Sequence, residues 1–255
     1  MDGIDLSKDE IVQIGISVLA ISFAFALIFS GASIWDGTLL ELFGSVHRGE
    51  FFVLMVLSVV TVGSGFVLHE MGHKLAAIYY GAQARFMMWT NGLVFMLITS
   101  VFMGVLFAAP GAVYIFADRI NDRQNGIISL AGPMVNLLIV FVFMALETVA
   151  PIKIYLSFFS GIPMAGFGIG DGAVHVWRFG AAINLILGMF NMIPAFPLDG
   201  SKIFKWDMKN WAAFLVALLA VGMFFQLIGL AYVIMWVIML VIAISLSRLA
   251  FGARS

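Results

Sequence analysis

Two histidines and a glutamate lie close together in an apolar stretch of this chain. The segment His69-Glu70-Met71-Gly72-His73 separates its histidines by four residues, so on a helix both imidazoles lie on one face. Two such imidazoles can bind one metal ion while the carboxylate of Glu70 stands beside them as a general base. Ionisable groups within a membrane span cost about 2.5 to 3.5 kcal/mol each, so their presence indicates function. The pattern predicts a zinc hydrolase site inside a membrane.

A third metal ligand must come from elsewhere in the chain, because a catalytic zinc typically takes three protein ligands and leaves a fourth position to water. The chain has no cysteine, so this ligand is a histidine, aspartate or glutamate. Asp199 is the best candidate: Pro194 and Pro197 break helical hydrogen bonding before it, and Gly200 relaxes the backbone after it. The alternative interpretation is that these residues only form a turn at a helix end.

Two amide side chains in apolar surroundings are further candidates. Asn191 lies eight residues before Asp199, and we expect it to contact substrate or an oxyanion. Asn136 follows Gly132 at the start of another apolar run. An interhelical hydrogen bond explains Asn136 as well as a catalytic role does, so we leave it outside the predicted catalytic set.

The composition is that of a polytopic membrane protein with an all-α fold. Of its 255 residues 63% are hydrophobic and only 11% are charged, and the net charge of −1 argues against a nucleic-acid partner. Residues 211–246 carry no formal charge and are too long for one span, so we expect two helices that turn near Gln226 and Gly229. Together with the remaining apolar runs this predicts about six transmembrane helices; those runs are 11–30, 51–80, 127–146 and 176–195.

Basic residues predict the orientation of these helices. In a six-span arrangement one side of the membrane receives most of them, and the positive-inside rule makes that side cytosolic. This larger group is Arg85, Arg119, Arg123, Lys202, Lys205, Lys209, Arg248 and Arg254. This places the site toward the cytosolic side, and we expect the membrane to be a prokaryotic cell membrane. The segment 92–109 is then expected to re-enter the bilayer without crossing it. A short β-hairpin can form there, while 152–170 stays open between spanning and re-entering.

Three motifs in this order resemble the site-2 protease family of intramembrane zinc metalloproteases, peptidase family M50. The resemblance covers about 51–205, the core of that family. The residues that carry it are His69-Glu70-x-x-His73, Gly132-Pro133-x-x-Asn136 and Asn191-x-x-Pro194-x-x-Pro197-Leu198-Asp199-Gly200.

The resemblance implies a role for each matching residue. His69, His73 and Asp199 match the ligands of one catalytic Zn²⁺, Glu70 matches the general base, and Asn191 matches an asparagine that contacts substrate. It also implies that the substrate is a transmembrane protein or peptide, cleaved within the lipid bilayer in regulated intramembrane proteolysis.

The chain departs from the family pattern in two respects. We expect one membrane-embedded domain over 1–255 with no PDZ or CBS domain, and the stretch between Ala84 and Asp118 is longer than the re-entrant hairpin of the smallest members. Two other functions stay open at this point. Intramembrane His and Asp also line the pathways of divalent-metal transporters, and an inactive relative could bind membrane proteins without cleaving them. The sequence does not predict the oligomeric state.

Overall fold

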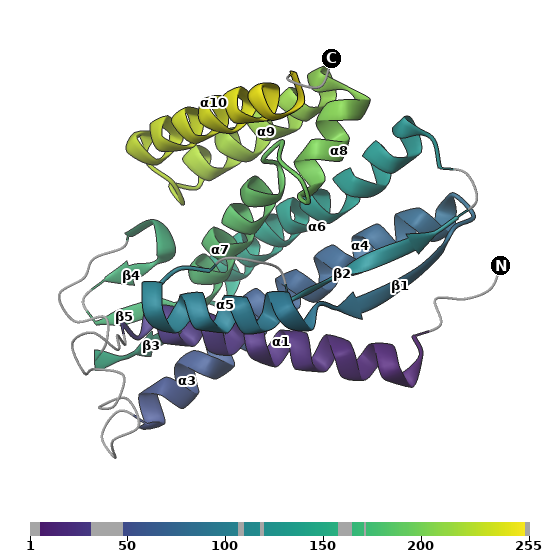
Figure 1. Cartoon of the computed structure of the whole chain (residues 1–255). Coiled ribbons are helices and arrows are strands. Elements are labelled where there is room, and N and C mark those ends of the chain that lie inside the picture. The colour runs from purple at the N-terminus through teal and green to yellow at the C-terminus, as the bar shows by residue number, and fades with distance from the viewer. Residues whose placement is uncertain are drawn as a thin grey trace.

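Long apolar helices dominate the computed structural model of this chain (Figure 1). The structure describes residues 6–31, 48–106, 110–117, 120–157, 165–170 and 172–252. Within these residues three helices are long and apolar enough to cross a membrane: α1 (Lys8–Phe29), the continuous helix Arg48–Tyr79, and α6 (Asp122–Val149). These three helices correspond to the predicted runs 11–30, 51–80 and 127–146.

The second of these helices carries the histidine motif and is interrupted by a wider turn. It consists of α3 (Arg48–Ser58), a π-helical turn over Val59–Gly63, and α4 (Ser64–Tyr79). Such turns inside α-helices occur frequently at functional sites. All of the motif residues lie on α4, so the predicted helical spacing of His69 and His73 is confirmed.

A β-hairpin follows α4, and a helix is inserted between its two strands. Strand β1 (Gln83–Met88) pairs antiparallel with β2 (Gly111–Phe116), and the pairing of Met88 with Gly111 brings the two ends of the insertion together. The insertion contains α5 (Thr90–Met103), which packs along α1 (Figure 1). The segment 89–110 therefore begins and ends at the same end of the hairpin. Residues 107–109 lie outside the described part of the chain.

A second small sheet separates α6 from α7. Helix α6 begins with a capping box, in which Asn121 and Gln124 exchange hydrogen bonds between side chain and backbone. After α6 the chain forms β3 (Lys153–Tyr155), β4 (Ile169–Gly170) and β5 (Ala173–His175), in the antiparallel order β3-β5-β4. The described part of 152–170 is therefore strand and 3-10 turn rather than a spanning helix. The sequence did not predict this sheet.

Four helices complete the chain: α7 (Val176–Asn191), α8 (Asp199–Trp206), α9 (Met208–Phe224) and α10 (Leu230–Gly252). Helix α7 ends at Asn191 rather than at 195, because the chain must leave the helix before Pro194. The predicted turn between the last two helices is confirmed, since α9 ends at Phe224 and Gln226 has a positive φ of 55°.

The buried hydrophobic side chains form two large clusters. One cluster joins α6 to α7, α8, α9 and α10, and the other joins α1, α3 and α4 to the hairpin, to α5 and to part of α7. Helix α4 packs on α6, and α6 packs on α7. Buried polar side chains from these three helices and from the start of α8 lie among the clusters, and they form the candidate site.

Candidate metal centre

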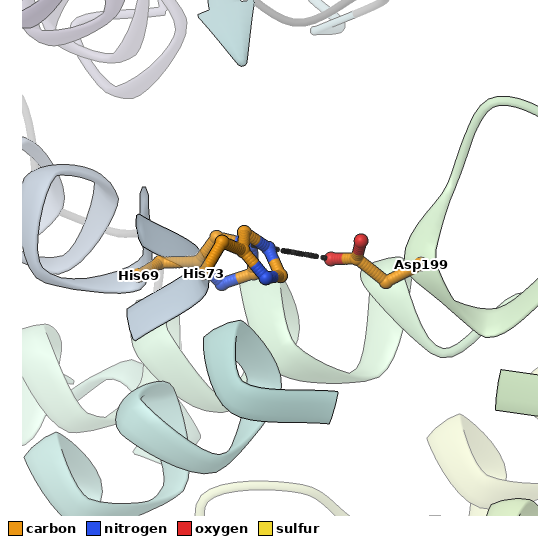
Figure 2. Close-up of side chains that lie close together, drawn as sticks. All are labelled: His69, His73 and Asp199. Atoms are coloured by element: carbon orange, nitrogen blue, oxygen red, sulfur yellow. Dashed lines mark hydrogen bonds and ion pairs between the residues drawn. The ribbon is translucent and has the colours of Figure 1, made fainter. Parts of the chain in front are cut away.

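The side chains of His69, His73 and Asp199 converge on one point (Figure 2). The two Nε2 atoms lie 3.0 Å apart, and Asp199 Oδ2 lies 3.3 Å from the Nε2 of His69 and 3.1 Å from that of His73. Each residue is at most 8% exposed. Within the described part of the chain this is the one group of three such residues whose ligand atoms could share a metal ion.

Hydrogen bonds on the other ring nitrogens fix the tautomer of both histidines. The Nδ1 of His73 lies 2.8 Å from the carbonyl oxygen of Ile128, which can only accept, so this nitrogen is a donor. The Nδ1 of His69 lies 2.6 Å from Asn136 Oδ1, which also accepts. A neutral imidazole that donates through Nδ1 has its lone pair on Nε2. Both lone pairs are therefore available where the rings converge.

This arrangement fits a metal ion. Two imidazole lone pairs and a carboxylate oxygen at such short distances repel one another unless a cation lies among them. A tetrahedral zinc with bonds of about 2.0 to 2.1 Å holds its ligand atoms roughly 3.3 Å apart. The observed separations of 3.0, 3.1 and 3.3 Å are close to that value.

A glycine on α6 makes room for the two imidazole rings. A Cβ atom at Gly132 would lie 2.5 Å from His73 Nε2 and 2.6 Å from His69 Nε2, so a side chain there would displace the ligand atoms. On α4, next to His73, a Cβ at Gly72 would lie 3.0 Å from the carbonyl oxygen of Ala131. Glycines on both helices thus let α4 and α6 approach closely at the level of the site.

A chain of amides links His69 to the π-helical turn. Asn136 accepts from His69 and donates through Nδ2 to Asn184 Oδ1 at 3.0 Å. Asn184 in turn donates to the carbonyl oxygens of Thr61, at 3.0 Å, and of Gly180, at 2.9 Å. Both asparagines are fully buried. Such outer partners orient metal ligands, so Asn136 supports the site by holding the ring of His69.

From the sequence, the role of Asn136 stayed open between a structural hydrogen bond and catalysis, and Asn184 was not identified as a site residue. The signal for Asn184 was available, because it is an uncharged polar residue in the middle of the apolar run 176–195. Its partner Thr61 could not be identified, since their separation along the chain depends on how α4 and α7 pack. A Cβ on Gly65 would lie only 2.1 Å from Asn184 Oδ1, so this glycine admits the amide.

Asp199 is the first residue of α8, directly after an irregular loop. The loop is fixed by a hydrogen bond from Trp211 Nε1 to the carbonyl oxygen of Met192, at 2.7 Å. Gly200 packs against the same loop residue, and a Cβ there would lie 2.3 Å from that oxygen. The Oδ1 atom of Asp199 faces Lys202 Nζ at 3.6 Å. The loop therefore delivers the carboxylate to the histidines as the sequence predicted, but from a helix start rather than from an unwound segment.

Glu70 lies beside the three converging residues and faces the hairpin. Its Oε2 accepts a hydrogen bond from the backbone N–H of Val113 in β2, at 2.8 Å. Val113 lies opposite Phe86 of β1, but its N–H bonds to Glu70 rather than to β1. This N–H is therefore on the outer edge of β2. The predicted general base therefore contacts the outer edge of this β-hairpin.

Asn191 is the predicted site residue for which the described part of the chain shows no hydrogen bond to this group. Its Nδ2 donates to the carbonyl oxygen of Leu187 on its own helix, at 3.0 Å, and the residue is half-buried near the end of α7. Its role in binding substrate stays a prediction.

Comparison with known proteins identifies the family of this chain. A model of peptidase family M50 matches residues 55–229, a range that contains His69, Glu70, His73 and Asp199. A Methanocaldococcus jannaschii protein that bears the name of a zinc metalloprotease is 36% identical over 206 residues, which cover 81% of this chain and 88% of the relative. The chain belongs to peptidase family M50. Its apolar helices and its family together make it an integral membrane protein of a zinc metalloprotease family.

Other M50 relatives are more distant. A second M. jannaschii zinc metalloprotease is 26% identical over 196 residues, which cover 77% of this chain but 43% of that relative. A Bacillus subtilis protein that also bears the name of a zinc metalloprotease is 27% identical over 164 residues, covering 60% of this chain and 69% of its own. No solved structure shows significant similarity to the chain.

The replacement Gly132→Ala should reduce zinc binding, because the added methyl group occupies the space of the two Nε2 atoms. We expect purified Gly132→Ala to hold well under half of the zinc of the wild type, measured as the metal-to-protein ratio by mass spectrometry. The matched control is Gly188→Ala on α7, where the nearest atom to a new Cβ would lie at 3.4 Å. Full zinc content in Gly132→Ala would show that the rings do not sit against this glycine.

Proposed function

We propose that this protein is a multi-pass intramembrane zinc endopeptidase that hydrolyses peptide bonds within or near transmembrane segments of membrane-protein substrates. The observation that carries the proposal is the convergence of His69, His73 and Asp199 at a buried point between apolar helices, with Glu70 beside them. This is the residue set of an HExxH zinc peptidase. The biological setting that fits such an enzyme is regulated intramembrane proteolysis.

In this proposal His69, His73 and Asp199 hold one catalytic Zn²⁺. When bound, zinc acts as a Lewis acid that polarises a carbonyl and lowers the pKa of a water molecule toward about 7. The Nδ1 hydrogen bonds to Asn136 and to the Ile128 carbonyl keep both Nε2 atoms aimed at the ion.

Glu70 acts as the general base and then as the general acid. It takes a proton from the attacking water and returns a proton to the leaving amine. Its neighbour in sequence is the ligand His69, so it lies about 100° around the helix from that ligand and reaches the site without ligating the ion. The hydrogen bond from Val113 N–H holds one carboxylate oxygen at 2.8 Å and fixes the direction of the other.

The outer edge of β2 is the proposed binding place for substrate. A transmembrane substrate must unwind locally before its carbonyls can be attacked, and an extended segment can then pair with an exposed strand edge. The edge of β2 touches Glu70 through Val113, so a segment paired with it lies next to the catalytic base. Asn191, at the end of α7, is the proposed further contact to substrate.

The proposed topology has about six spans with the site toward the cytosolic side of a prokaryotic cell membrane. Support for a re-entrant 92–109 comes from the pairing of Met88 with Gly111, which returns the chain to its starting point. Helices α7 and α9 are short and fit spans only together with their flanking residues. Helix α7 packs against the long helix α6, and α9 packs against α7 and α8.

A metal transporter explains the structure less well. Ion pathways need several polar groups at successive depths. In the described residues the candidate ligands form one group at one level. The amides of Asn136 and Asn184 behind it are hydrogen-bonded to His69, to each other and to backbone carbonyls. An inactive relative explains it less well too, since a metal held only for stability does not need a carboxylate placed as Glu70 is.

The replacement Glu70→Gln should abolish hydrolysis and leave zinc bound, because it removes the base but none of the three proposed ligands. The measurement is cleavage of a panel of single-span peptides by detergent-purified protein, with zinc content measured on the same samples. Glu50→Gln is the matched control. Glu50 lies at the start of α3, away from the site, and its carboxylate accepts hydrogen bonds from the exposed Ser157. Loss of zinc in Glu70→Gln would reassign Glu70 as a ligand, and full activity would refute its role as base.

Single cysteines test the proposed topology in this naturally cysteine-free chain. Gln83 is the first residue of the hairpin, and Gln124 follows its second strand. If 92–109 re-enters without crossing, Gln83→Cys and Gln124→Cys should both react with a membrane-impermeant thiol reagent only from the cytosolic side. The measurement is labelling of intact cells against inverted membrane vesicles. Labelling of position 124 from outside would mean that the segment between the two positions crosses the membrane.

A further inference from the structure

A buried ion pair that the proposed chemistry does not use joins α1 to the motif helix. The Nζ atom of Lys74 lies 2.6 Å from Oε1 of Glu10, and each residue is 2% exposed. Lys74 directly follows His73 on α4, and Glu10 lies in the first turn of α1. Glu10 precedes the range 55–229 that matches the family model. Buried charges are costly unless paired, so this pair indicates a defined placement of α1.

The same face of α1 occupies the outer edge of β1. Glu10 Oε1 also accepts a hydrogen bond from the backbone N–H of Phe86, at 3.0 Å, and Gln13 Oε1 accepts one from the N–H of Met88, at 2.8 Å. Residues two apart on a strand point their N–H groups to one edge, and residues three apart on a helix share a face. The side chains of Glu10 and Gln13 thus accept hydrogen bonds from the outward N–H groups of β1, as the carbonyls of a neighbouring strand would.

The hairpin carries this contact through to Glu70. Phe86 and Val113 are directly opposite each other, and their N–H groups point in opposite directions, one to Glu10 and the other to Glu70. Phe86 is fully buried and packs edge-on against Phe66 of α4, with ring centroids 5.9 Å apart. Contacts thus run from Glu10 of α1 through β1 and β2 to Glu70 of α4. Lys74, one turn after Glu70 on α4, pairs with Glu10 and links α4 directly back to α1.

We propose that Glu10 and Gln13 are positioning residues that occupy the outer edge of β1 and thereby fix the β2 edge against Glu70 and the metal centre. They touch neither the ligands nor the proposed substrate path, so they act through the hairpin. Because α1 occupies the outer edge of β1, the proposed place for an extended substrate is the outer edge of β2, where Glu70 already accepts from the N–H of Val113. The expected effect on kcat rests on the proposed function, whereas the expected effect on the stability of the hairpin does not.

Gln13→Leu removes one acceptor without leaving an unpaired charge, and Gln13 is only half-buried. A substrate paired with β2 moves together with the hairpin, so binding is kept while the scissile bond is displaced from Glu70. A misplacement of about 1 Å can cost about 100-fold in rate. We expect kcat for a single-span peptide to fall about tenfold or more, with KM within about twofold of wild type and zinc content unchanged.

Three further variants separate positioning from general damage. Gln13→Glu keeps an acceptor oxygen and should restore most of kcat, whereas Val12→Ala, at an exposed position of the same helix, should behave as wild type. The double variant Glu10→Leu with Lys74→Met removes both buried charges together and should lower kcat as Gln13→Leu does. Wild-type kcat in Gln13→Leu, a rise in KM at unchanged kcat, or no rescue by Gln13→Glu overturns the proposal.

Hydrogen–deuterium exchange of the full-length protein provides a test that needs no activity. In Gln13→Leu, amides of 83–88 and of 111–116 should exchange faster than in wild type, with those of α6 unchanged. A wild-type protein that cleaves none of the peptides overturns the proposed function alone. Faster exchange in both strands then still supports positioning by α1, and unchanged exchange in both strands overturns it.

Discussion

The structure depends on bringing three electron-rich atoms together where water cannot compensate them. The Nε2 atoms of His69 and His73 and Oδ2 of Asp199 lie within 3.3 Å of one another and are buried. A cation among them turns this repulsion into binding, provided that each ring presents its lone pair. The Asn136 amide and the Ile128 carbonyl, both on α6, fix that orientation, so the candidate metal centre depends on the packing of α4 on α6.

The same motif helix also organises the surface on which a substrate would lie. One turn of α4 presents Glu70 to the outer edge of β2 and Lys74 to Glu10 of α1. The hairpin is thus held between two carboxylates, one on each side, at the directly opposed residues Phe86 and Val113. This arrangement places a strand edge beside the proposed base inside an apolar protein, where irregular backbone is tolerated only if protein surrounds it.

Much of the site was predictable from the sequence because its signals are local. The spacing of His69 and His73 needs only a helix, and the prolines before Asp199 mark a break in any helix. The apolar runs likewise predicted the long helices and the turn at Gln226. The three-stranded sheet over 153–175 was missed because its strands are only two or three residues long and carry no clear alternation. Asn184 and the pair Glu10–Lys74 were missed because their meaning depends on partners 123 and 64 residues away.

In the proposed enzyme two histidines and one aspartate hold a zinc ion in the membrane. X-ray absorption at the zinc edge of the purified protein tests this coordination most directly. We expect two imidazole nitrogens and one carboxylate oxygen at about 2.0 to 2.2 Å, with one further oxygen ligand. In Asp199→Ala the carboxylate contribution should disappear, or the zinc should be lost. A shell of oxygens alone, a third imidazole, or an Asp199→Ala spectrum identical to that of the wild type would refute this coordination.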